Sequence, residues 1–333
     1  MLFNPKVSVI IPVYNGANYM REAIDSALAQ TYGNIEIIVV NDGSTDNTEG
    51  IALSYGDKIR YFAKANGGVA TALNLGIREM GGEYFSWLSH DDIYLPEKIK
   101  KNVAALNNET DKTRIVYSDY DVIDAKRKYV STISAKKLHH AADYEFGLLP
   151  IIRGYLHGCT LLIHRSHFEQ HGLFDEALRT TQDYDLFFKM FRGQRLIYLP
   201  ESLVKGRIHS KQTGTVSEKT FTEGDILWET MLKSLTHEEM RAIDGSEEQF
   251  WFNQAGFMET STHYENATKY AFDRLGRLKE SGMNIDSMRN SAALPQWRYN
   301  IFRRAFRALR RHGFKGFCKV IAKRVKRIRG RRH

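Results

Sequence analysis

Glu83-Tyr-Phe-Ser-Trp-Leu-Ser-His-Asp-Asp92 is an apolar run that ends at two adjacent carboxylates. The run is typical of a short buried strand, and Pro96, just beyond it, can occupy the first turn of a helix. The sequence therefore predicts that Asp91 and Asp92 lie on a strand-to-helix loop. In open α/β sheets, ligands bind at this edge of the sheet.

The pair Asp91 and Asp92 has two interpretations. Adjacent carboxylates repel each other unless a cation or a shared proton separates them, and hard oxygen ligands of this kind suit a Mg²⁺ or Mn²⁺ ion that carries substrate phosphates. The alternative is a solvated turn that caps the helix at Pro96, since Asp-Asp turns are common. The dipeptide alone favours the turn, so the choice between the two interpretations depends on the surrounding sequence.

The segments before this stretch alternate between strand and helix patterns. Residues 7–11 and 35–40 are near-continuous apolar runs, as in the central strands of a parallel sheet. Apolar residues recur at helical spacing over 20–27 and 69–80. This alternation predicts an α/β fold with a mostly parallel sheet and helices on both faces. Beyond residue 220 the pattern is helical.

The phosphate-binding motifs of other α/β enzymes are missing from the sequence. No G-x-G-x-x-G follows the first strand and no G-x-x-x-x-G-K-[ST] occurs, which argues against a dinucleotide-binding dehydrogenase and a P-loop enzyme. A sugar-nucleotide pyrophosphorylase would carry a glycine-rich, basic loop after the first strand. The loop here is Pro12-Val-Tyr-Asn-Gly16, without a cation.

Length and composition indicate a globular protein of one or two domains. The 333 residues are 42% hydrophobic and 12% aromatic, which is enough for a sizeable core. The two cysteines, Cys159 and Cys318, are too few for a disulfide framework, so a reducing compartment is expected. The sequence has no signal-peptide pattern and no run of about 18 apolar residues, and we expect a cytoplasmic protein.

The positive charge of the chain is concentrated at its end. The formal net charge is +9, yet residues 298–333 hold 15 basic residues and no acid, so the rest of the chain carries −6. Apolar residues share one helical face in this tail, which predicts basic amphipathic helices that bind the anionic inner face of a membrane. The alternative is a solvated basic face that packs on the acidic body.

Three stretches resemble the family 2 nucleotide-sugar glycosyltransferases: Val7-Ser-Val-Ile-Ile-Pro-Val-Tyr-Asn-Gly16, Ile37-Ile-Val-Val-Asn-Asp-Gly-Ser-Thr-Asp46 and Leu88-Ser-His-Asp-Asp92. Three further pieces agree in order and spacing: Asn66-Gly-Gly-Val-Ala-Thr-Ala-Leu-Asn-Leu-Gly76, His157-Gly-Cys-Thr-Leu-Leu-Ile163, and Gly172-Leu-Phe-Asp-Glu176 followed by Gln182-Asp-Tyr-Asp-Leu186. The resemblance spans roughly residues 5 to 215 and implies a GT-A fold; the helical pattern beyond residue 220 predicts that a helical C-terminal region follows it.

The resemblance also implies a domain organisation. Residues 1–216 are expected to form the catalytic domain, with the nucleotide-sugar half in about 1–95 and the acceptor half in about 96–216. Beyond the resemblance, the residue pattern predicts a helical extension, 217–295, and the basic amphipathic tail, 296–333. Within the acceptor half, residues 126–140 are polar, basic and without an apolar period, and we expect a mobile loop there.

By resemblance, ten residues bind the nucleotide sugar: Pro12, Tyr14, Asn15, Asp42, Asn66, Gly67, Ser89, His90, Asp91 and Asp92. Asp42 looks like the residue that reads the nucleotide base, and its alternative interpretation is an Asp-Gly turn. Family members often have an arginine where this chain has Leu73, which removes one possible diphosphate contact.

The predicted metal ligands for Mg²⁺ or Mn²⁺ are Asp91 and His209. The family usually has Asp-x-Asp-Asp at the metal loop, whereas Ser89 stands at the leading position here. Asp92 is the better candidate for positioning the loop. His209 occupies a place where the family often has a histidine near the diphosphate, although a histidine alone is a weak metal signal.

Asp183 is the predicted catalytic base, and His157 and Gln182 are placed on the acceptor side. Asp183 falls in the first turn of a predicted helix, where a simple N-terminal charge stabilised by the helix dipole is the alternative. Family members carry Glu-Asp where this chain has Gln182 and Asp183. A covalent intermediate would need a second acid, so a single displacement with inversion is expected.

We therefore expect an inverting, metal-dependent glycosyltransferase that uses a UDP-, GDP- or dTDP-linked sugar and a glycan or lipid-linked acceptor. The resemblance suggests surface-polysaccharide synthesis, such as O-antigen, capsule or exopolysaccharide. A second copy of the chain is among the expected partners. The alternatives are a nucleic-acid-binding protein that uses the basic tail, and a non-catalytic sugar-nucleotide-binding module. The acidic body and the paired acids argue against them.

Overall fold

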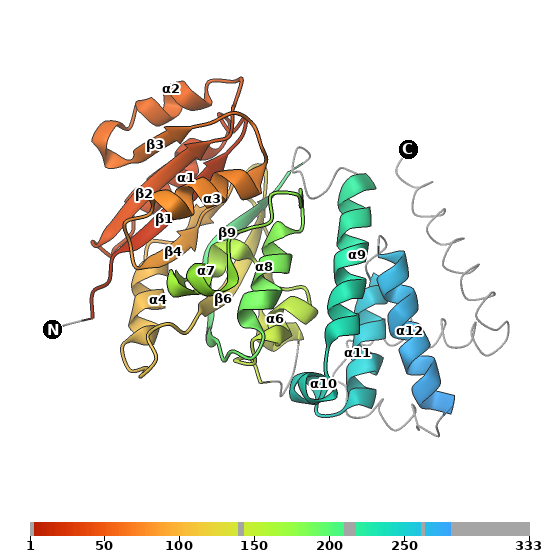
Figure 1. Cartoon of the computed structure of the whole chain (residues 1–333). Helices are drawn as coiled ribbons and strands as arrows, with labels where there is room; N and C mark the ends of the chain where they lie inside the picture. The colour runs from red at the N-terminus through yellow and green to blue at the C-terminus, as the bar shows by residue number, and fades with distance from the viewer. Residues whose placement is uncertain (1–2, 139–142, 210–217, 261–263, 281–333) are drawn as a thin grey trace. The chain divides into compact units, whose positions relative to one another are not determined.

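The computed structural model describes residues 3–138, 143–209, 218–260 and 264–280, and the chain divides into two compact units, Met1–Leu227 and Trp228–His333 (Figure 1). The first unit extends past residue 216, where the sequence places the end of the catalytic domain. The predicted tail, 296–333, lies outside the described residues. Within the described ranges, no helix is long and apolar enough to cross a membrane.

A five-stranded sheet forms the N-terminal part of the first unit, with strand order β3-β2-β1-β4-β8. Its strands are β1 (Val7–Val13), β2 (Ile35–Asn41), β3 (Arg60–Ala63), β4 (Tyr84–Trp87) and β8 (Ile163–His164). The first four run parallel, and β8 pairs antiparallel with β4. The predicted α/β fold with a mostly parallel sheet is confirmed.

Helices and one 3₁₀ helix connect these parallel strands: α1 (Met20–Leu28), α2 (Thr48–Leu53), η1 (Gly56–Lys58) and α3 (Val69–Glu79). Apolar faces of α1 and α3 pack on β1 and β2, because their buried residues recur at helical spacing. Pro12 lies inside β1 instead of ending it. The strand β4 pairs with β1 only as far as Ile10, so Pro12 removes no hydrogen bond from that ladder.

A second, four-stranded sheet was not predicted as a separate element. Its strand order is β5-β9-β6-β7, with β5 (Ile93–Tyr94), β9 (Ile197–Ile208), β6 (Val116–Asp124) and β7 (Tyr129–Ile133). The expectation of a mobile loop at 126–140 is wrong for its described part, because β7 pairs antiparallel with β6 and α5 (Ala135–Leu138) follows. The strand β5 also divides the loop expected between Asp92 and Pro96.

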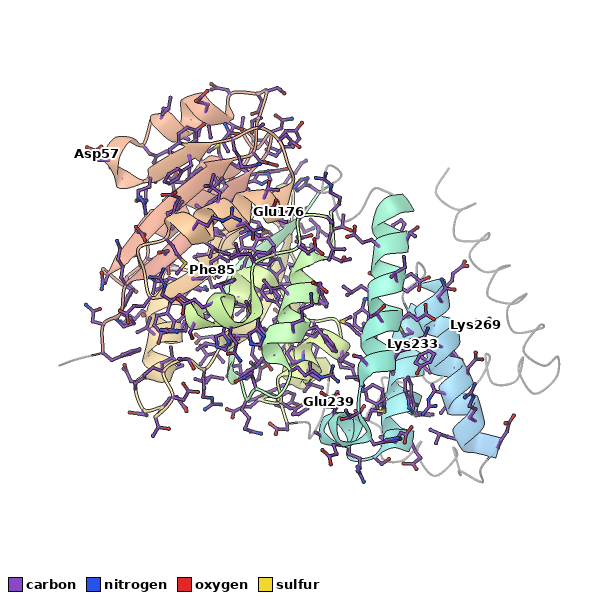
Figure 2. The ribbon with its side chains drawn as sticks, viewed as in Figure 1. Asp57, Phe85, Glu176, Lys233, Glu239 and Lys269 are labelled. Atoms are coloured by element: carbon purple, nitrogen blue, oxygen red, sulfur yellow. The ribbon has the colours of Figure 1, made fainter. Side chains whose placement is uncertain are left out.

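The remaining elements of the first unit are α4 (Lys98–Leu106), α6 (Leu148–Ile152), η2 (Gly158–Thr160), α7 (Ser166–His171) and α8 (Gln182–Phe191). Aromatic rings join β4 to these helices. Phe85, labelled in Figure 2, lies edge-to-face with Phe168 at 5.0 Å between ring centroids, and Phe174 contacts Phe187 on α8 at 5.9 Å. This core fixes α8 relative to the strand that precedes the Asp91 loop.

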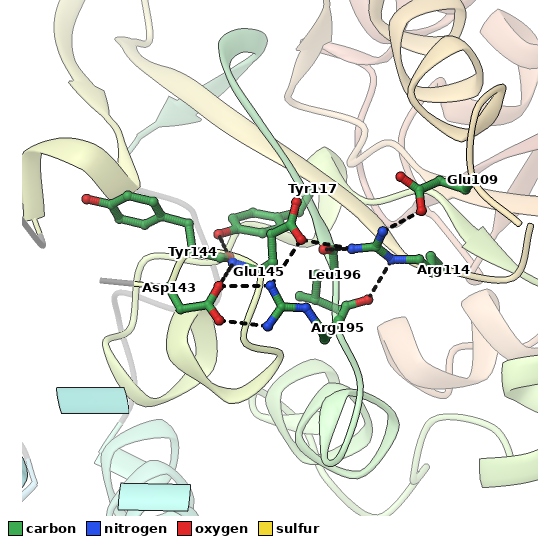
Figure 3. Close-up of polar contacts among 8 residues, drawn as sticks. All are labelled: Glu109, Arg114, Tyr117, Asp143, Tyr144, Glu145, Arg195 and Leu196. Atoms are coloured by element: carbon green, nitrogen blue, oxygen red, sulfur yellow. Dashed lines mark hydrogen bonds and ion pairs between the residues drawn. The ribbon is translucent and has the colours of Figure 1, made fainter. Parts of the chain in front are cut away.

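An ion-pair network ties the segment before α6 to the starts of β6 and β9 (Figure 3). Arg114 pairs with Glu109 and Glu145, and Arg195 pairs with Asp143 and Glu145. Arg114 also donates to the carbonyl of Leu196 at 2.6 Å. Because Glu145 joins both guanidinium groups, the network acts as a unit rather than as isolated surface pairs.

The helix α9 (Glu218–Ser234) begins in the first unit, and the second unit continues with α10 (His237–Asp244), α11 (Glu247–Thr260) and α12 (Glu265–Glu280). A capping box starts α10, where the Thr236 hydroxyl and the Glu239 carboxylate each accept from the other residue's N–H. Phe250 and Trp251 are fully buried, which makes α11 the core helix of this unit.

Candidate active site

Three predicted site segments lie at the carboxyl ends of β1, β2 and β4. These strands are parallel neighbours, so their carboxyl ends meet at one edge of the sheet. Asp42 directly follows β2, and its N–H donates to the carbonyl of Val13 at 2.8 Å. Leu88 directly follows β4, and its N–H donates to the carbonyl of Ile10 at 3.0 Å. The topology thus brings the predicted donor-binding residues to a common edge.

Asp42, Asn66 and Gly67 form one cluster at this edge. The carboxylate of Asp42 accepts from the Lys64 Nζ at 2.6 Å and from the N–H groups of Gly67 and Gly68 at 2.9 and 2.7 Å. The Asn66 side chain donates to the Asp42 carbonyl at 3.0 Å. Asp42 therefore fixes the turn at 66–68, and its role in reading a base stays a prediction.

The predicted residues at the end of β1 and in the loop after it differ in exposure. Pro12 is buried in the strand, whereas the Tyr14 side chain is 48% exposed and open to a ligand. Asn15 has a left-handed φ of 48°, and its side-chain oxygen accepts from the N–H of Thr45 at 2.8 Å. Asn15 therefore joins the loops that follow β1 and β2, which holds Tyr14 over the sheet edge.

The predicted metal ligands Asp91 and His209 lie together. The Nε2 of His209 is 2.9 Å from the Oδ2 of Asp91, and both side chains are about nine-tenths buried. His209 directly follows β9, 118 positions after Asp91, so the second sheet delivers it to the loop after β4. Tyr19 lies against the imidazole ring, with the ring centroids 5.1 Å apart.

Arg207 holds the carboxylate loop in place, although no local pattern in the sequence marks it as a site residue. Its side chain is 1% exposed, its Nε donates to the Asp91 carbonyl at 2.7 Å, and its backbone N–H donates to the Asp92 carboxylate at 2.8 Å. An ion pair at 2.8 Å to Glu22 neutralises the guanidinium, which also lies 4.4 Å from the ring centroid of Tyr19.

We expect the Arg207→Met variant to lose about 2 kcal/mol of unfolding free energy, because the substitution removes the hydrogen bond from the buried guanidinium to the Asp91 carbonyl together with the ion pair to the partly exposed Glu22. Urea denaturation followed by tryptophan fluorescence measures the loss. Arg21→Met is the control: Arg21 is an exposed arginine whose guanidinium donates to Ser54 at 3.4 Å, and the variant should change stability by less than about 0.5 kcal/mol. Equal stability of the two variants would contradict this account of Arg207.

Asp92 belongs to a buried cluster with His157 and Cys159. The thiol of Cys159 donates to Asp92 Oδ2 at 3.3 Å, and His157 Nε2 lies 3.5 Å from the same oxygen. Burial raises the pKa of both Asp92 and the Cys159 thiol, and the nearby His157 opposes the shift at Asp92. The sequence did not single out Cys159, whose thiol anchors the loop by accepting from the Ser89 N–H at 3.3 Å.

Among the described residues, these same three side chains form a group that could hold a metal ion, with their ligand atoms within 4.8 Å of one another. A thiol must lose its proton before it binds a metal, and burial makes that loss harder for Cys159. The Cys159 thiol already donates to Asp92 Oδ2, and the Arg207 N–H donates to Asp92 Oδ1. We therefore interpret the cluster as a hydrogen-bonded support for the loop, which agrees with the positioning role expected for Asp92.

The other two residues of the loop, Ser89 and His90, are half-buried. The Ser89 hydroxyl lies 3.4 Å from Cys159 Sγ. His90 lies beside Gly16, where a Cβ would approach the imidazole Cδ2 to 2.6 Å, so only glycine fits there. Burial lowers the pKa of His90, although the charge of Asp91 opposes the shift. The neutral His90 ring therefore packs the Asp91 loop against the end of β1.

Asp183 lies in the first turn of α8, as predicted. Burial raises the pKa of its carboxyl, while hydrogen bonds from the N–H of Tyr184 and from its own N–H oppose the shift. The charge of His157, which lies 3.5 Å from Asp92 Oδ2, also lowers the pKa of Asp183, so the imidazole is near both carboxyl groups. The Gln182 side chain is buried in the same turn. The two predicted acceptor-side residues thus flank the predicted base.

Comparison with known proteins relates this arrangement to one family. The family described as "Glycosyl transferase family 2" matches residues 8–172. An "Uncharacterized glycosyltransferase RP339" of Rickettsia prowazekii is 51% identical over 265 residues, which are 80% of this chain and 83% of that protein. An "Uncharacterized glycosyltransferase" of Rickettsia felis is 51% identical over 272 residues, but the chain spans only 45% of that protein's length.

Two solved structures share the fold. TarS residues 1–349 of S. aureus, in complex with UDP-GlcNAc, has a TM-score of 0.57 at 19% identity, covering 81% of each chain. The mannosyltransferase PcManGT of Pyrobaculum calidifontis, in complex with GDP-Man and Mn²⁺, has a TM-score of 0.57 at 17% identity, covering 96% of this chain and 84% of that one. At these identities the likeness extends to the fold alone.

Proposed function

Because the chain belongs to glycosyl transferase family 2, we propose that it transfers a sugar from a nucleotide-sugar donor to a hydroxyl group of a glycan or lipid-linked acceptor. The family and the GT-A fold expected from the sequence are confirmed. The observation that supports the proposal is that the Asp91–His209 pair and the Asp92–His157 contact lie at the loop after β4, with His157 close enough to Asp183 to lower the pKa of that carboxyl. These residues would supply both a binding site for a donor that carries phosphate groups and a carboxylate base.

The donor class is proposed as a UDP-, GDP- or dTDP-linked sugar. Two proteins of the same fold were solved with UDP-GlcNAc and with GDP-Man, which supports a nucleotide sugar without choosing between the bases. In this chain the exposed Tyr14 and the turn at 66–68 would border the nucleotide. Lys64 and Asp42 neutralise each other within that border, with 2.6 Å between Nζ and Oδ1.

The residues present fit a Mg²⁺ or Mn²⁺ ion. Asp91 and His209 offer a carboxylate oxygen and an imidazole nitrogen 2.9 Å apart, close to the roughly 3 Å between neighbouring ligands of a six-coordinate ion. The ion, when bound, would neutralise negative charge on the diphosphate leaving group. Arg207 and Asp92 would keep the Asp91 loop in one conformation for that purpose.

Asp183 is proposed to remove the proton of the acceptor hydroxyl as that oxygen attacks the anomeric carbon. A positioned base of this kind contributes roughly 10²–10⁴-fold to the rate. One displacement inverts the anomeric configuration. Gln182, the neighbouring residue, has no carboxylate to form a covalent glycosyl intermediate.

The proposal is tested by a screen of nucleotide sugars. A cognate donor is expected to raise the melting temperature of the protein in the presence of Mn²⁺ and to be hydrolysed slowly without acceptor. Addition of EDTA should abolish both effects, and the matching nucleoside should produce neither. If no UDP-, GDP- or dTDP-linked sugar stabilises the protein or is hydrolysed, the proposed function is wrong.

We further propose that residues 298–333 hold the enzyme at the inner face of the membrane, beside a lipid-linked acceptor for surface polysaccharide. The support is the charge of this segment, 15 basic residues without an acid. The full chain should float with anionic liposomes at low salt, whereas a chain that ends at Pro295 should remain in solution and still hydrolyse donor. Equal flotation of the two chains would contradict the proposal.

A further inference from the structure

Glu223, on α9 of the first unit, binds a run of three residues that leads into α8. Its carboxylate accepts from the N–H groups of Arg179, Thr180 and Thr181 at 3.0, 2.8 and 2.9 Å. It also accepts from the hydroxyl groups of Thr180 and Thr181 at 3.0 and 2.8 Å. One side chain therefore receives five hydrogen bonds from a single turn of the chain.

The start of α8 depends on this carboxylate. Thr181 is the N-cap residue of α8, yet its side chain makes no capping bond to the helix and turns to Glu223 instead. The negative charge also suits the positive end of the helix dipole. Although burial alone would raise it, the N–H groups of Arg179 and Thr180 hold the pKa of Glu223 below its usual value. The carboxylate is thus ionised at neutral pH.

The same three residues reach the donor side of the site through Arg179. Its Nη1 donates to the Gly67 carbonyl at 2.6 Å. At Gly68, with φ of 97°, a Cβ would lie 2.8 Å from that nitrogen, so glycine is needed for the guanidinium to lie there. The N–H groups of Gly67 and Gly68 in turn bind Asp42. Residues 179–181 therefore connect the Asp42 turn to the helix of Asp183.

We propose that Glu223 is a positioning residue, which fixes residues 179–181 so that Asp183 faces the attacking hydroxyl while the donor turn at 66–68 stays in register. This inference rests on the proposed function. Glu223 binds residues 179–181 and is not among the predicted donor or acceptor residues, so its loss should disturb the geometry of reaction rather than donor affinity. A displacement of about 1 Å at a reacting group costs on the order of 100-fold in rate.

The test compares the Glu223→Ala and Glu223→Gln variants in the full chain. The probe is the UDP-, GDP- or dTDP-linked sugar that the unaltered protein hydrolyses with Mn²⁺, with UDP-GlcNAc and GDP-mannose tested first. We expect Glu223→Ala to lower kcat about 10- to 100-fold, with calorimetric affinity for the nucleoside diphosphate within about twofold. Glu223→Gln keeps an acceptor oxygen, so its kcat should lie between those of the unaltered protein and Glu223→Ala.

Glu229→Ala is the matched control, because Glu229 lies on the same helix and makes an i,i+4 pair with Lys233 at 2.8 Å. Its kcat should equal that of the unaltered protein. An unchanged kcat in Glu223→Ala would overturn the inference. A loss of kcat in Glu223→Ala that comes with a comparable fold-loss of nucleotide affinity and a lower melting temperature would also overturn it. That result would indicate a merely structural role. If the unaltered protein neither binds nor hydrolyses any UDP-, GDP- or dTDP-linked sugar, the proposed function itself fails.

Discussion

The Asp183→Asn variant is expected to turn over its donor at least about 100-fold more slowly than the unaltered enzyme, with donor affinity nearly unchanged. Asparagine keeps the size of aspartate but cannot take up a proton at neutral pH. Its side-chain oxygen can still accept from the Tyr184 N–H, which donates to Asp183 at 2.9 Å, so the start of α8 should be preserved. Steady-state rates and calorimetry on the same preparations separate the two effects.

Asp185→Asn provides the control for this substitution. Asp185 is two positions further along α8 and pairs with Lys189 at 2.6 Å, so its loss removes an acid from the same turn without touching Asp183. Rates near those of the unaltered enzyme in Asp183→Asn would exclude the general-base role. A product that retains the donor's anomeric configuration by NMR would contradict the single displacement.

The pH dependence of the rate gives an independent measurement of the same base. Asp183 accepts a proton only in its ionised form, so the rate should rise with pH through the pKa of this carboxyl. Burial raises that pKa, so the rise in rate should lie at a higher pH than the range of an ordinary aspartate, which titrates at about pH 4. In Asp183→Asn the rise should disappear.

The Asp91→Ala variant is expected to lose Mn²⁺-dependent binding of the nucleoside diphosphate altogether. The substitution removes the carboxylate that lies 2.9 Å from His209. It leaves the Asp91 carbonyl, which accepts from Arg207 Nε at 2.7 Å, so the loop should keep its backbone conformation. Calorimetry with UDP or GDP, with and without Mn²⁺, measures the loss, and a circular dichroism spectrum checks the fold.

Asp57→Ala is the control for Asp91→Ala. Asp57 is an exposed aspartate on η1, outside the predicted site, and its replacement should leave nucleotide affinity unchanged (Figure 2). If Asp91→Ala binds the nucleoside diphosphate as tightly as the unaltered protein in the presence of Mn²⁺, Asp91 is not the metal ligand. A loss of binding without Mn²⁺ as well would indicate instead that Asp91 shapes the nucleotide site.

The parallel strands β1 and β4 could be predicted because they are buried along their whole length. Every residue of β1 and β4 is buried, and such strands are continuous apolar runs in the sequence. The strand β7 escaped prediction because its residues are exposed or half-buried, with no alternation to mark a buried face. Its pairing with β6 depends on backbone hydrogen bonds, which leave no trace in the side-chain pattern.

The residues of the candidate site also fall into two groups, those that the sequence predicts and those that it does not. Asp91 and Asp183 could be singled out because each lies at the end of an element that the sequence predicts, within a motif that resembles the family. The supporting residues depend on partners far along the chain. Arg207 pairs with Glu22 across 185 positions, and Glu223 binds Thr180 across 43. No local pattern encodes such contacts, so only the three-dimensional structure reveals them.

The alternation of buried and exposed residues at the end of β9 restricts which insertions and deletions this protein can tolerate. Arg207 is 1% exposed, Ile208 is 48% exposed and the His209 side chain is 10% exposed, so alternate residues face the carboxylate loop. An insertion or deletion of one residue between Lys205 and Arg207 would exchange these faces and turn isoleucine toward Asp92. Before Lys205, shifts in register with β6 already interrupt the ladder, and a bulge there could absorb an added residue. An insertion or deletion between Lys205 and Arg207 should therefore be tolerated less well than one before Lys205.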